Sequence, residues 1–224
     1  MKEKGIVSWS GGKDSVLALC EILKAGCYDV LGLLTTVTVD FDRISVHGVR
    51  RVLVEQQAIS LDFPLEKMLV PKGVGDREYE NKLLAVLEGN RNKDVSSVVF
   101  GDIFLEDVRE YREQLLSKVG MKGLFPLWKR NTRELAHNFI DNGFKATVTV
   151  VDSNFLGGEF AGRELDEPFL SDLPSIVDPC SENGEFHSFV YDGPIFRERV
   201  HFVKGEVVLK ENRFYYCDLI PNMK

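Results

Sequence analysis

The sequence lacks the features that mark membrane, secreted and metal-cluster proteins. It contains only four cysteines in 224 residues, and no two of them form a Cys-x-x-Cys pair. This argues against a disulfide framework and against a zinc or iron–sulfur cluster. No apolar run is long enough to span a bilayer, and Met1 to Lys4 lead into the first apolar stretch without a signal region. We therefore expect a cytoplasmic protein with no membrane segment.

Positive charge is also in short supply. The chain has 28 Lys and Arg residues against 35 Asp and Glu residues, which gives a formal net charge of −7. Such a balance does not favour non-specific binding to nucleic acid or to an anionic membrane, so no nucleic-acid partner is expected. The length suits one large domain, or a standard domain followed by a smaller one.

What the sequence does contain is a glycine loop near its N-terminus. Ile6–Trp9 predicts a buried strand, and the apolar spacing from Val16 to Leu23 predicts a helix. Adjacent glycines leave room for an anion, and the helix dipole favours negative charge at this end. We expect Asp14 or Ser15 to cap the helix and Lys13 to supply a mobile positive charge. The predicted phosphate-binding loop comprises Ser10, Gly11, Gly12, Lys13, Asp14 and Ser15.

Two common phosphate-binding patterns do not fit this loop. A Walker A loop needs a glycine six positions before its lysine and a Ser or Thr directly after it, and these positions hold Val7 and Asp14. The dinucleotide fingerprint is also absent, because no glycine follows Gly11 and Gly12 at the later spacing. A kinase-like or GTPase-like loop and a dinucleotide site are therefore excluded.

Strands and helices alternate through the first part of the chain. That order predicts an α/β fold with a doubly wound parallel sheet, whose ligands bind at the carboxyl ends of the strands. The expected strands after the loop are 30–39, 65–70, 96–103 and 124–128, and the expected helices are 49–61, 78–88 and 105–119.

The last third of the chain has a different composition. Its expected strands follow one another with little helix between them, and Lys204-Gly205 is expected to be a hairpin turn. This change predicts a second, smaller α+β domain after the parallel sheet. We place the boundary between residues 129 and 130.

Three segments fall at the carboxyl ends of predicted strands and should line one crevice. They are the glycine loop, residues 35–47 and Gly101-Asp102. Asp102 is expected to hold Mg²⁺ or a substrate amine, although a helix cap remains an open alternative. His47 and Arg50 either reach the nucleotide or the substrate, or belong to an exposed helix start.

A second cluster of reactive residue types lies in residues 178–189. Glu182, Glu185 and His187 can project to one side of a turn that enters a strand. The alternative is a surface loop held down by its phenylalanines. Cys180 has no base paired with it in the sequence, so we favour a structural role for its thiol.

The glycine loop resembles, residue for residue, the pyrophosphate loop (PP-loop) of the N-type ATP pyrophosphatases, Ser-Gly-Gly-x-Asp-Ser. Four further segments extend this likeness over the whole chain, which resembles the diphthine–ammonia ligase-like family: residues 101–103, 125–128, 178–189 and 192–194. The resemblance implies a PP-loop ATP-binding domain of the adenine nucleotide alpha hydrolase-like fold over residues 1–129. It implies a substrate-binding domain over residues 130–224.

The activity that this resemblance implies is ATP-dependent amidation of the diphthine side chain on translation elongation factor 2. A carboxylate would take AMP from ATP, pyrophosphate would leave into the PP-loop, and ammonia would then attack. Lys13 and the loop amides would offset the repulsion between the attacking carboxylate and the phosphates, and Asp14 and Asp102 would hold Mg²⁺. Gly101 would add to the nucleotide site. Glu182, Glu185 or His187 would orient ammonia and take its proton, and the sequence does not rank the three.

One departure from the family pattern affects the substrate. Diphthamide-making members resemble Glu-Gly-Gly-Glu-x-Glu-Thr here, whereas residues 182–188 of this chain carry His187 and Ser188 in place of the third acid and the threonine. The resemblance therefore supports the family's reaction class for this chain more strongly than it supports the family's substrate. A ligase for a small-metabolite carboxylate and a non-catalytic ATP-binding sensor stay open as alternatives. The nitrogen source and the assembly, a homodimer included, are open as well.

Overall fold

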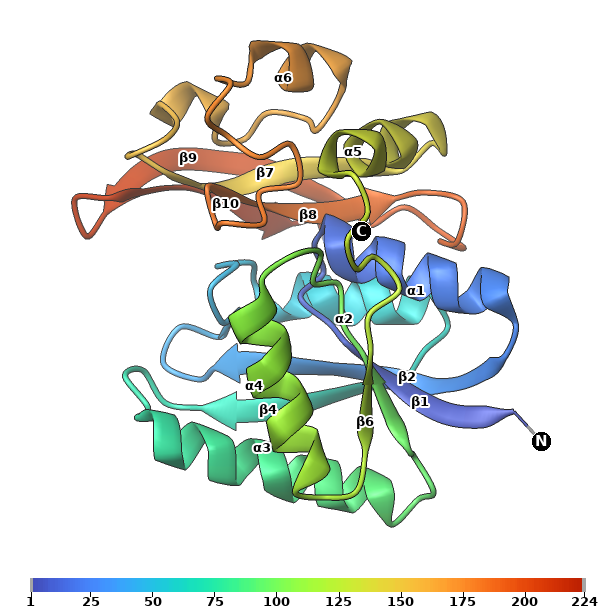
Figure 1. Cartoon of the computed structure of the whole chain (residues 1–224). Coiled ribbons are helices and arrows are strands. Elements are labelled where there is room, and N and C mark those ends of the chain that lie inside the picture. The colour runs from blue at the N-terminus through green and yellow to red at the C-terminus, as the bar shows by residue number, and fades with distance from the viewer. Residues whose placement is uncertain (1, 223–224) are drawn as a thin grey trace.

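The computed structural model describes residues 2–222 and contains two β-sheets (Figure 1). The outermost residues of the two predicted domains, residue 1 and residues 223–224, lie outside the described part. None of the helices in residues 2–222 has both the length and the apolar content needed to cross a membrane.

The first sheet is parallel apart from one short strand. Its parallel strands run in the order β4-β2-β1-β5-β6, and β3 pairs antiparallel with the end of β2. The strand order reverses direction beside β1, which is the topological switch point of a doubly wound sheet. The predicted α/β fold class is therefore confirmed. The strands are β1 (Glu3–Ser8), β2 (Tyr28–Thr38), β3 (Arg43–Ile44), β4 (Leu65–Val70), β5 (Ser97–Val99) and β6 (Lys122–Leu124).

Helices cover both faces of this sheet. The helices α1 (Lys13–Ala25) and α2 (Arg51–Ser60) lie on one face, and α3 (Asp76–Arg91) and α4 (Glu106–Ser117) lie on the other (Figure 1). The helix α1 forms because Val16, Leu19 and Ile22 repeat on one face and are buried. Gly26 ends it in a left-handed conformation with φ of 66°.

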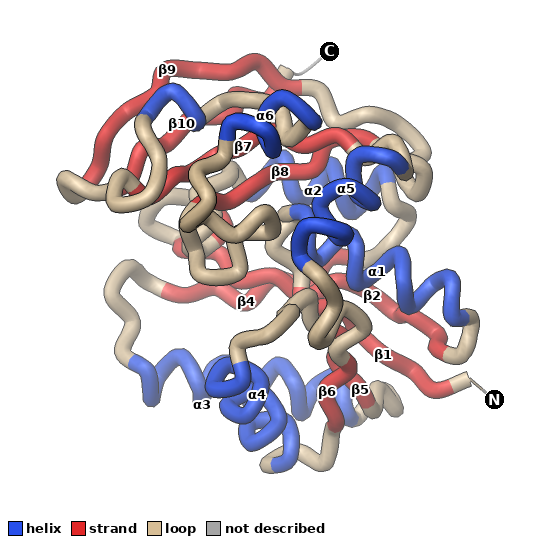
Figure 2. The backbone as a smooth tube through the Cα atoms, turned by 45° about the horizontal axis from the view of Figure 1, so that its top comes forward, coloured by secondary structure: helices blue, strands red, loops and turns tan. Residues whose placement is uncertain are grey.

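The second sheet is antiparallel, with strand order β8-β7-β10-β9. It lies on the side of the first sheet that carries α1 and α2, and α6 lies on its far side (Figures 1 and 2). The predicted second α+β part is therefore present. Its elements are α5 (Thr132–Asp141), β7 (Lys145–Asp152), a 3-10 turn (Gly158–Phe160), α6 (Glu167–Asp172), β8 (Phe186–Asp192), β9 (Phe202–Lys210) and β10 (Phe214–Pro221).

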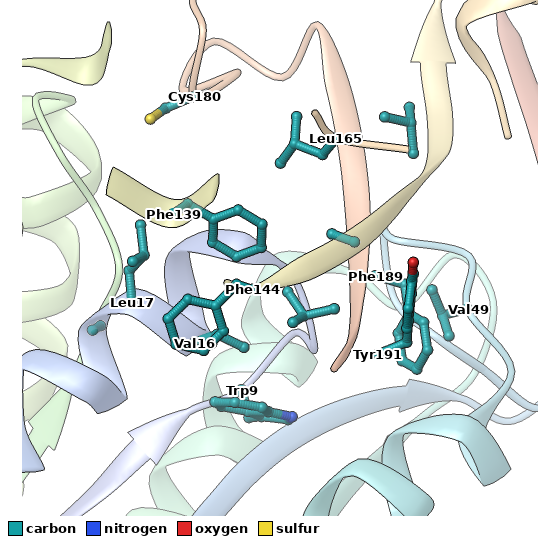
Figure 3. Close-up of a cluster of buried hydrophobic side chains, with 14 of the residues drawn as sticks. Trp9, Val16, Leu17, Val49, Phe139, Phe144, Leu165, Cys180, Phe189 and Tyr191 are labelled. Carbon is teal, nitrogen blue, oxygen red and sulfur yellow. The ribbon is translucent and has the colours of Figure 1, made fainter. Parts of the chain in front are cut away.

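One hydrophobic core joins the two sheets. Trp9 and Val16 from the first part pack with Phe139, Phe144 and Phe189 from the second in a single buried cluster (Figure 3). A smaller cluster fills the space beneath α3 and α4 on the other face of the first sheet. The helix α1 is thus buried between two sheets, which explains why most of its residues are buried.

Two local predictions were wrong. Lys204-Gly205 is not a hairpin turn, because β9 runs through it and the turn falls at Glu211 and Asn212, whose φ values are 53° and 51°. The predicted strand at 124–128 ends at Leu124, because the chain turns at the following residues and the Trp128 amide donates to the Phe125 carbonyl at 3.1 Å.

Candidate functional site

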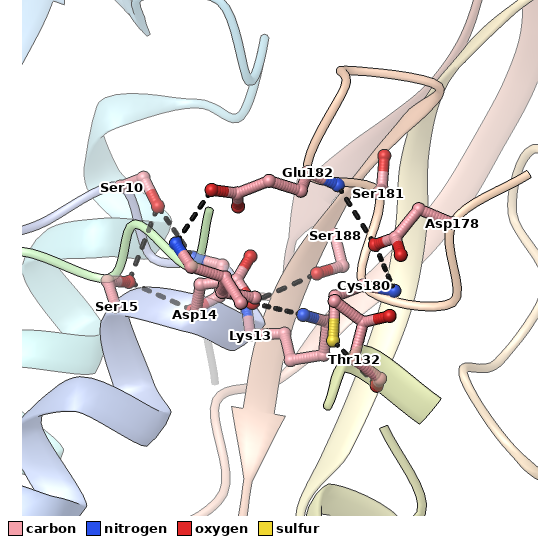
Figure 4. Close-up of polar contacts among 12 residues, drawn as sticks. Ser10, Lys13, Asp14, Ser15, Thr132, Asp178, Cys180, Ser181, Glu182 and Ser188 are labelled. Carbon is pink, nitrogen blue, oxygen red and sulfur yellow. Dashed lines mark hydrogen bonds and ion pairs between the residues drawn. The ribbon is translucent and has the colours of Figure 1, made fainter. Parts of the chain in front are cut away.

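The glycine loop follows β1 at the switch point and opens into a cavity of about 430 Å³. The ends of β2 and β5 line this cavity, as do Cys180, Ser181, Glu182, Gly184 and residues 186–188 from the second part of the chain. Figure 4 shows Glu182 and Ser188 reaching from that part toward the loop. The structure therefore brings the two predicted clusters together in one place.

Gly11 is held by a buried glutamine that the sequence analysis missed. The Gln57 side chain donates to the Gly11 carbonyl at 2.9 Å and accepts from the Trp9 indole at 3.1 Å. The Val190 amide also donates to the Gly11 carbonyl at 2.9 Å. Gly11 has φ of 79°, and a Cβ there would lie 2.6 Å from the Gln57 oxygen, so the position requires glycine. A lone glutamine in a helix carries no sequence signal of such a role.

The first turn of α1 is not capped by its own side chains. Gly12 is the N-cap residue, and the expected capping by Asp14 or Ser15 is wrong. The Ser15 hydroxyl donates to the Gly12 carbonyl at 2.9 Å, and the Lys13 amide donates to the Ser188 hydroxyl at 3.2 Å. A serine of β8 thus accepts the hydrogen bond of one amide of the glycine loop.

Lys13 is not a mobile charge, contrary to expectation. Its side chain is 1% exposed and forms an ion pair with Asp14. Burial alone would lower the pKa of the Lys13 ammonium, but Asp14 and Cys180 together outweigh burial and raise it. Lys13 is therefore a buried positive charge at the start of α1, paired with the Asp14 carboxylate.

Three carboxylates influence one another at the cavity. Burial raises the pKa of Asp14, Lys13 opposes that shift, and Asp102 adds to it. Gly101 allows the approach, since a Cβ there would lie 2.7 Å from the Asp14 backbone carbon. Asp102 also forms a 2.8 Å ion pair with Arg112 of α4 and does not cap that helix, whose N-cap is Leu105.

Glu182 is the third acid, and it fastens the second part of the chain to the first. Its carboxylate accepts from the amides of Ile103 and Phe104 at 2.6 and 3.1 Å. Burial raises the pKa of Glu182, those two amides lower it, and Asp14 and Asp102 raise it further. The net direction is upward, so Glu182 binds a proton more readily than an exposed glutamate does.

Glu185 lies apart from the cavity lining. Its side chain is 1% exposed and accepts from the Asp178 amide at 3.0 Å and from the Asn183 side chain at 3.1 Å. In the structure it holds the turn between Asp178 and β8 together.

Cys180 lines the cavity beside Lys13. Burial raises the pKa of its thiol to about 12, although Lys13 acts in the opposite direction. The thiol donates to the Thr132 carbonyl at 3.1 Å. A thiol with so high a pKa stays protonated at neutral pH and is a poor nucleophile.

His47 and His187 come together as a ring pair in the cavity. Their centroids lie 4.4 Å apart with planes tilted by 39°. Burial lowers the pKa of His187 to about 4, and burial together with His187 lowers that of His47 well below its usual value. Arg50 does not line the cavity and instead pairs with Asp218 at 2.6 Å.

Mg²⁺ fits the donor chemistry of the site only with help from phosphate oxygens. Within residues 2–222 there is no group of three or more His, Cys, Asp or Glu side chains arranged to bind a metal. Asp14 and Asp102 both line the cavity, and Mg²⁺ on nucleotides is usually held by one or two carboxylates, phosphate oxygens and water. Two carboxylates are therefore enough protein ligands for Mg²⁺ when it is bound to a nucleotide.

Fold and site together define the class of protein: an α/β protein with a glycine loop at the switch point of a doubly wound sheet, closed by a C-terminal antiparallel part. The chain belongs to the diphthamide synthase family. The diphthamide synthase N-terminal domain matches residues 3–123, and the diphthamide synthase C-terminal domain matches residues 131–220. The predicted family resemblance is confirmed.

Several curated relatives are called diphthine–ammonia ligase. The Schizosaccharomyces pombe protein is 23% identical over 227 residues, covering 93% of this chain and 37% of the relative. The human protein is 28% identical over 122 residues, covering 52% of this chain and 46% of the relative. The Danio rerio protein is 24% identical over 233 residues, covering 93% of this chain and 89% of the relative. The matches thus span less than half the length of the first two relatives.

Proposed function

We propose that this chain is an ATP-dependent ligase that transfers AMP to an acceptor carboxylate with release of pyrophosphate, and then joins ammonia to the activated carbonyl with release of AMP and a proton. The observation that carries the proposal is the glycine loop at the switch point, which opens into a cavity shared with residues 180–188. The family and the names of its relatives support the reaction class. In this proposal residues 1–129 bind ATP and residues 130–224 bind the acceptor.

The triphosphate of ATP would lie against the glycine loop. Backbone amides at the start of α1 and the buried charge of Lys13 favour an anion there and would stabilise departing pyrophosphate. The cavity also has an apolar side beneath α3 and α4, lined by Leu83, Leu87 and Phe100. We assign the purine to this side, because an apolar and aromatic wall suits a flat base.

Mg²⁺ would be shared between Asp14, Asp102 and phosphate oxygens. When bound, it would neutralise phosphate charge and make the α-phosphorus easier for a carboxylate to attack. Asp14 is already paired with Lys13 and close to the loop. We therefore assign it to metal and loop geometry and not to proton transfer.

We assign the proton of the attacking ammonia to Glu182. It lines the cavity, its position is fixed by the Ile103 and Phe104 amides, and its raised pKa favours proton uptake. Glu185 has no such access and is assigned to the turn that carries Glu182. His187 lines the cavity next to the loop.

The acceptor is either a protein side chain, as the name diphthine–ammonia ligase indicates for the relatives, or a small-metabolite carboxylate. The neutral His187 in place of the family motif's third acid favours an acceptor that differs from diphthine near this residue. Because the reaction consumes ATP, we propose the cytoplasm as its compartment.

Pyrophosphate release tests this function. Purified protein is incubated with ATP, Mg²⁺, ammonium chloride and a cell extract, and both pyrophosphate and AMP are measured. We expect both products in equal amounts, dependent on the extract and on ammonium. Tight ATP binding without either product would favour the sensor, and absence of ATP binding would reject the proposal.

Isotope labelling separates the two acceptor classes. With ¹⁵N-ammonium in the same reaction, we expect the label in either the protein fraction or the small-molecule filtrate of the extract. Label in protein identifies a side-chain acceptor, whereas label in the filtrate identifies a metabolite. Pyrophosphate release without label in either fraction would contradict amidation.

A further inference from the structure

The histidine pair at the cavity is the feature that the proposed function leaves without a role. His47 follows β3 and His187 belongs to β8, so the two rings come from opposite parts of the chain. Both backbones are tied to the same hydroxyl, because Thr149 donates to the His47 and His187 carbonyls at 3.3 Å each. Thr149 is 2% exposed. The pair is therefore built into the core and not placed by chance contact.

The pair touches the glycine loop. A Cβ on Gly12 would lie 3.2 Å from Cε1 of His47, so the ring packs directly against the loop. Ser188, the residue after His187, accepts from the Lys13 amide at 3.2 Å. The rings thus border the place where a phosphate on the loop would end.

His47 carries a buried polar atom without a partner. Within residues 2–222, Nδ1 of His47 is buried and makes no hydrogen bond. Buried polar atoms are almost always paired, so an unpaired one in a cavity wall indicates a group that binds there. A neutral imidazole has one donor and one bare nitrogen, and a proton converts the bare nitrogen into a second donor.

We propose that His47 and His187 form an oxyanion-binding pair whose ring N–H groups hold a negatively charged oxygen beside Gly12. The oxygen belongs either to the α-phosphate of the nucleotide or to the acceptor carboxylate. This inference rests on the proposed function, and it adds the residues that hold the anion at the reacting end of the cavity.

Binding by this pair is coupled to a proton. The charged groups that line the same cavity are Lys13 and Asp14 of α1, Asp102 after β5, Arg112 of α4 and Glu182. In the described chain neither ring hydrogen-bonds to any of them, and both rings are neutral at pH 7 because they are buried side by side. An entering anion favours the charged form of one ring, so binding takes a proton from the solvent.

Calorimetry of the whole protein tests the inference. Three titrations are run at pH 7 with Mg²⁺, each in two buffers that differ in heat of protonation. The first adds pyrophosphate, the second adds AMP, and the third adds α,β-methylene-ATP and then succinate. If the bound anion is the α-phosphate, we expect the protein to take up about one proton when AMP binds. If the bound anion is a carboxylate, we expect this uptake only when succinate is added. Pyrophosphate alone should bind without proton uptake.

The His187→Asn variant gives the matched comparison. It should abolish the proton uptake and weaken binding of the responsible probe about tenfold, while pyrophosphate affinity changes less than twofold. His137→Asn is the control, since His137 is an exposed histidine of α5 paired with Glu167 at 2.8 Å. The control should behave as wild type in every arm.

A wild-type measurement guards against misfolding of the variant. NMR titration of the four histidine rings should show the pKa of one ring of the pair rising by more than one pH unit when the probe binds, with His137 and His201 unchanged. The inference would be overturned if nucleotide binds normally but neither AMP nor succinate causes proton uptake and neither ring of the pair changes its pKa. That result would leave the proposed function standing. Failure of wild-type protein to bind AMP or the ATP analogue would overturn both.

Discussion

Single residues of the glycine loop are held by contacts with distant parts of the chain. Lys13 is buried against Asp14, Gly11 accepts from Gln57, and the Lys13 amide is taken by Ser188. The charge and shape of the loop are therefore set before any nucleotide binds. This is the preorganisation that electrostatic catalysis requires.

Lys13 is the residue on whose charge the proposed chemistry depends most. Lys13→Met keeps most of the volume and removes the charge that, in the proposed function, stabilises departing pyrophosphate. We expect pyrophosphate release to fall about 100-fold or more, measured with saturating ATP. Lys24→Met in the last turn of the same helix, where the side chain is 60% exposed, should leave the rate unchanged. Equal rates for both variants would place the phosphate site elsewhere.

Gly101 should be intolerant of any side chain. In Gly101→Ala the Cβ would lie 2.7 Å from a backbone atom of Asp14, and neither strand end nor helix start can move freely. We expect a loss of about 1–3 kcal/mol in unfolding free energy and weaker ATP binding, measured by urea unfolding and calorimetry. Gly89→Ala in α3 has nothing within 4 Å of its Cβ and should stabilise the protein by up to about 1 kcal/mol. Similar effects of the two substitutions would contradict the contact.

At the scale of elements, α1 and α2 connect the two sheets. The helix α1 is buried between the sheets, and Gln57 of α2 reaches both Gly11 and the Val190 carbonyl of β8. The strand β3 and the start of α2 are both tied to β10, because Arg43 of β3 and Arg50, the N-cap of α2, pair with Asp218 at 2.9 and 2.6 Å. These contacts determine how the second part of the chain sits over the loop.

The Asp218 contact should be visible in the pH dependence of stability. Burial alone would raise the pKa of Asp218, but hydrogen bonds from Arg50 and Arg43 outweigh burial and lower it to about 2. The folded pKa lies below the unfolded value of about 3.9, so the stabilisation is complete above about pH 5 and is lost as pH falls from there toward pH 2. Asp218→Asn should remove about 1 kcal/mol at pH 6 and little at pH 2.5, once solvent screening is allowed for.

Urea unfolding at several pH values checks this sign. Asp62→Asn is the control, because Asp62 is 63% exposed in an exposed ion pair with Arg197 and should contribute little at any pH. A stability difference for Asp218→Asn that grows as pH falls would contradict the assigned direction.

At the scale of the whole molecule, the two sheets share one hydrophobic core. Trp9 in the first part and Phe189 in the second belong to the same buried cluster. Neither part can bury its apolar face without the other. Division into two functional domains is thus compatible with a single folding unit.

We expect the chain to unfold in one cooperative transition. Tryptophan fluorescence reports on the first part, because Trp9 and Trp128 both lie in residues 1–129, and circular dichroism reports on the whole chain, so their urea transitions should coincide. Phe189→Ala in β8 should shift both transitions together, lowering unfolding free energy by about 3–5 kcal/mol. Ile176→Ala, at a side chain that is 71% exposed, should shift neither. Separate transitions for the two probes would show independent domains.

The fold class could be predicted from sequence because it depends on local patterns. Apolar spacing in α1 and the alternation of strands and helices are written in neighbouring residues, and the chirality of crossovers then leaves few topologies. Errors occurred where tertiary contacts override local preference. Gly205 lies inside β9 because pairing with β10 continues past it.

The sequence alone determined that a glycine loop lies at the carboxyl end of a buried parallel strand, since six adjacent residues and the apolar runs on either side carry that information. Only the tertiary structure decided which side chains complete the cavity. Glu182 and His187 reach it, whereas Glu185 turns into its own loop, although all three lie within six residues. Gln57 and the pairing of His47 with His187 were also decided in three dimensions. Burial and charge at such sites come from segments far apart in the chain, and no local pattern records them.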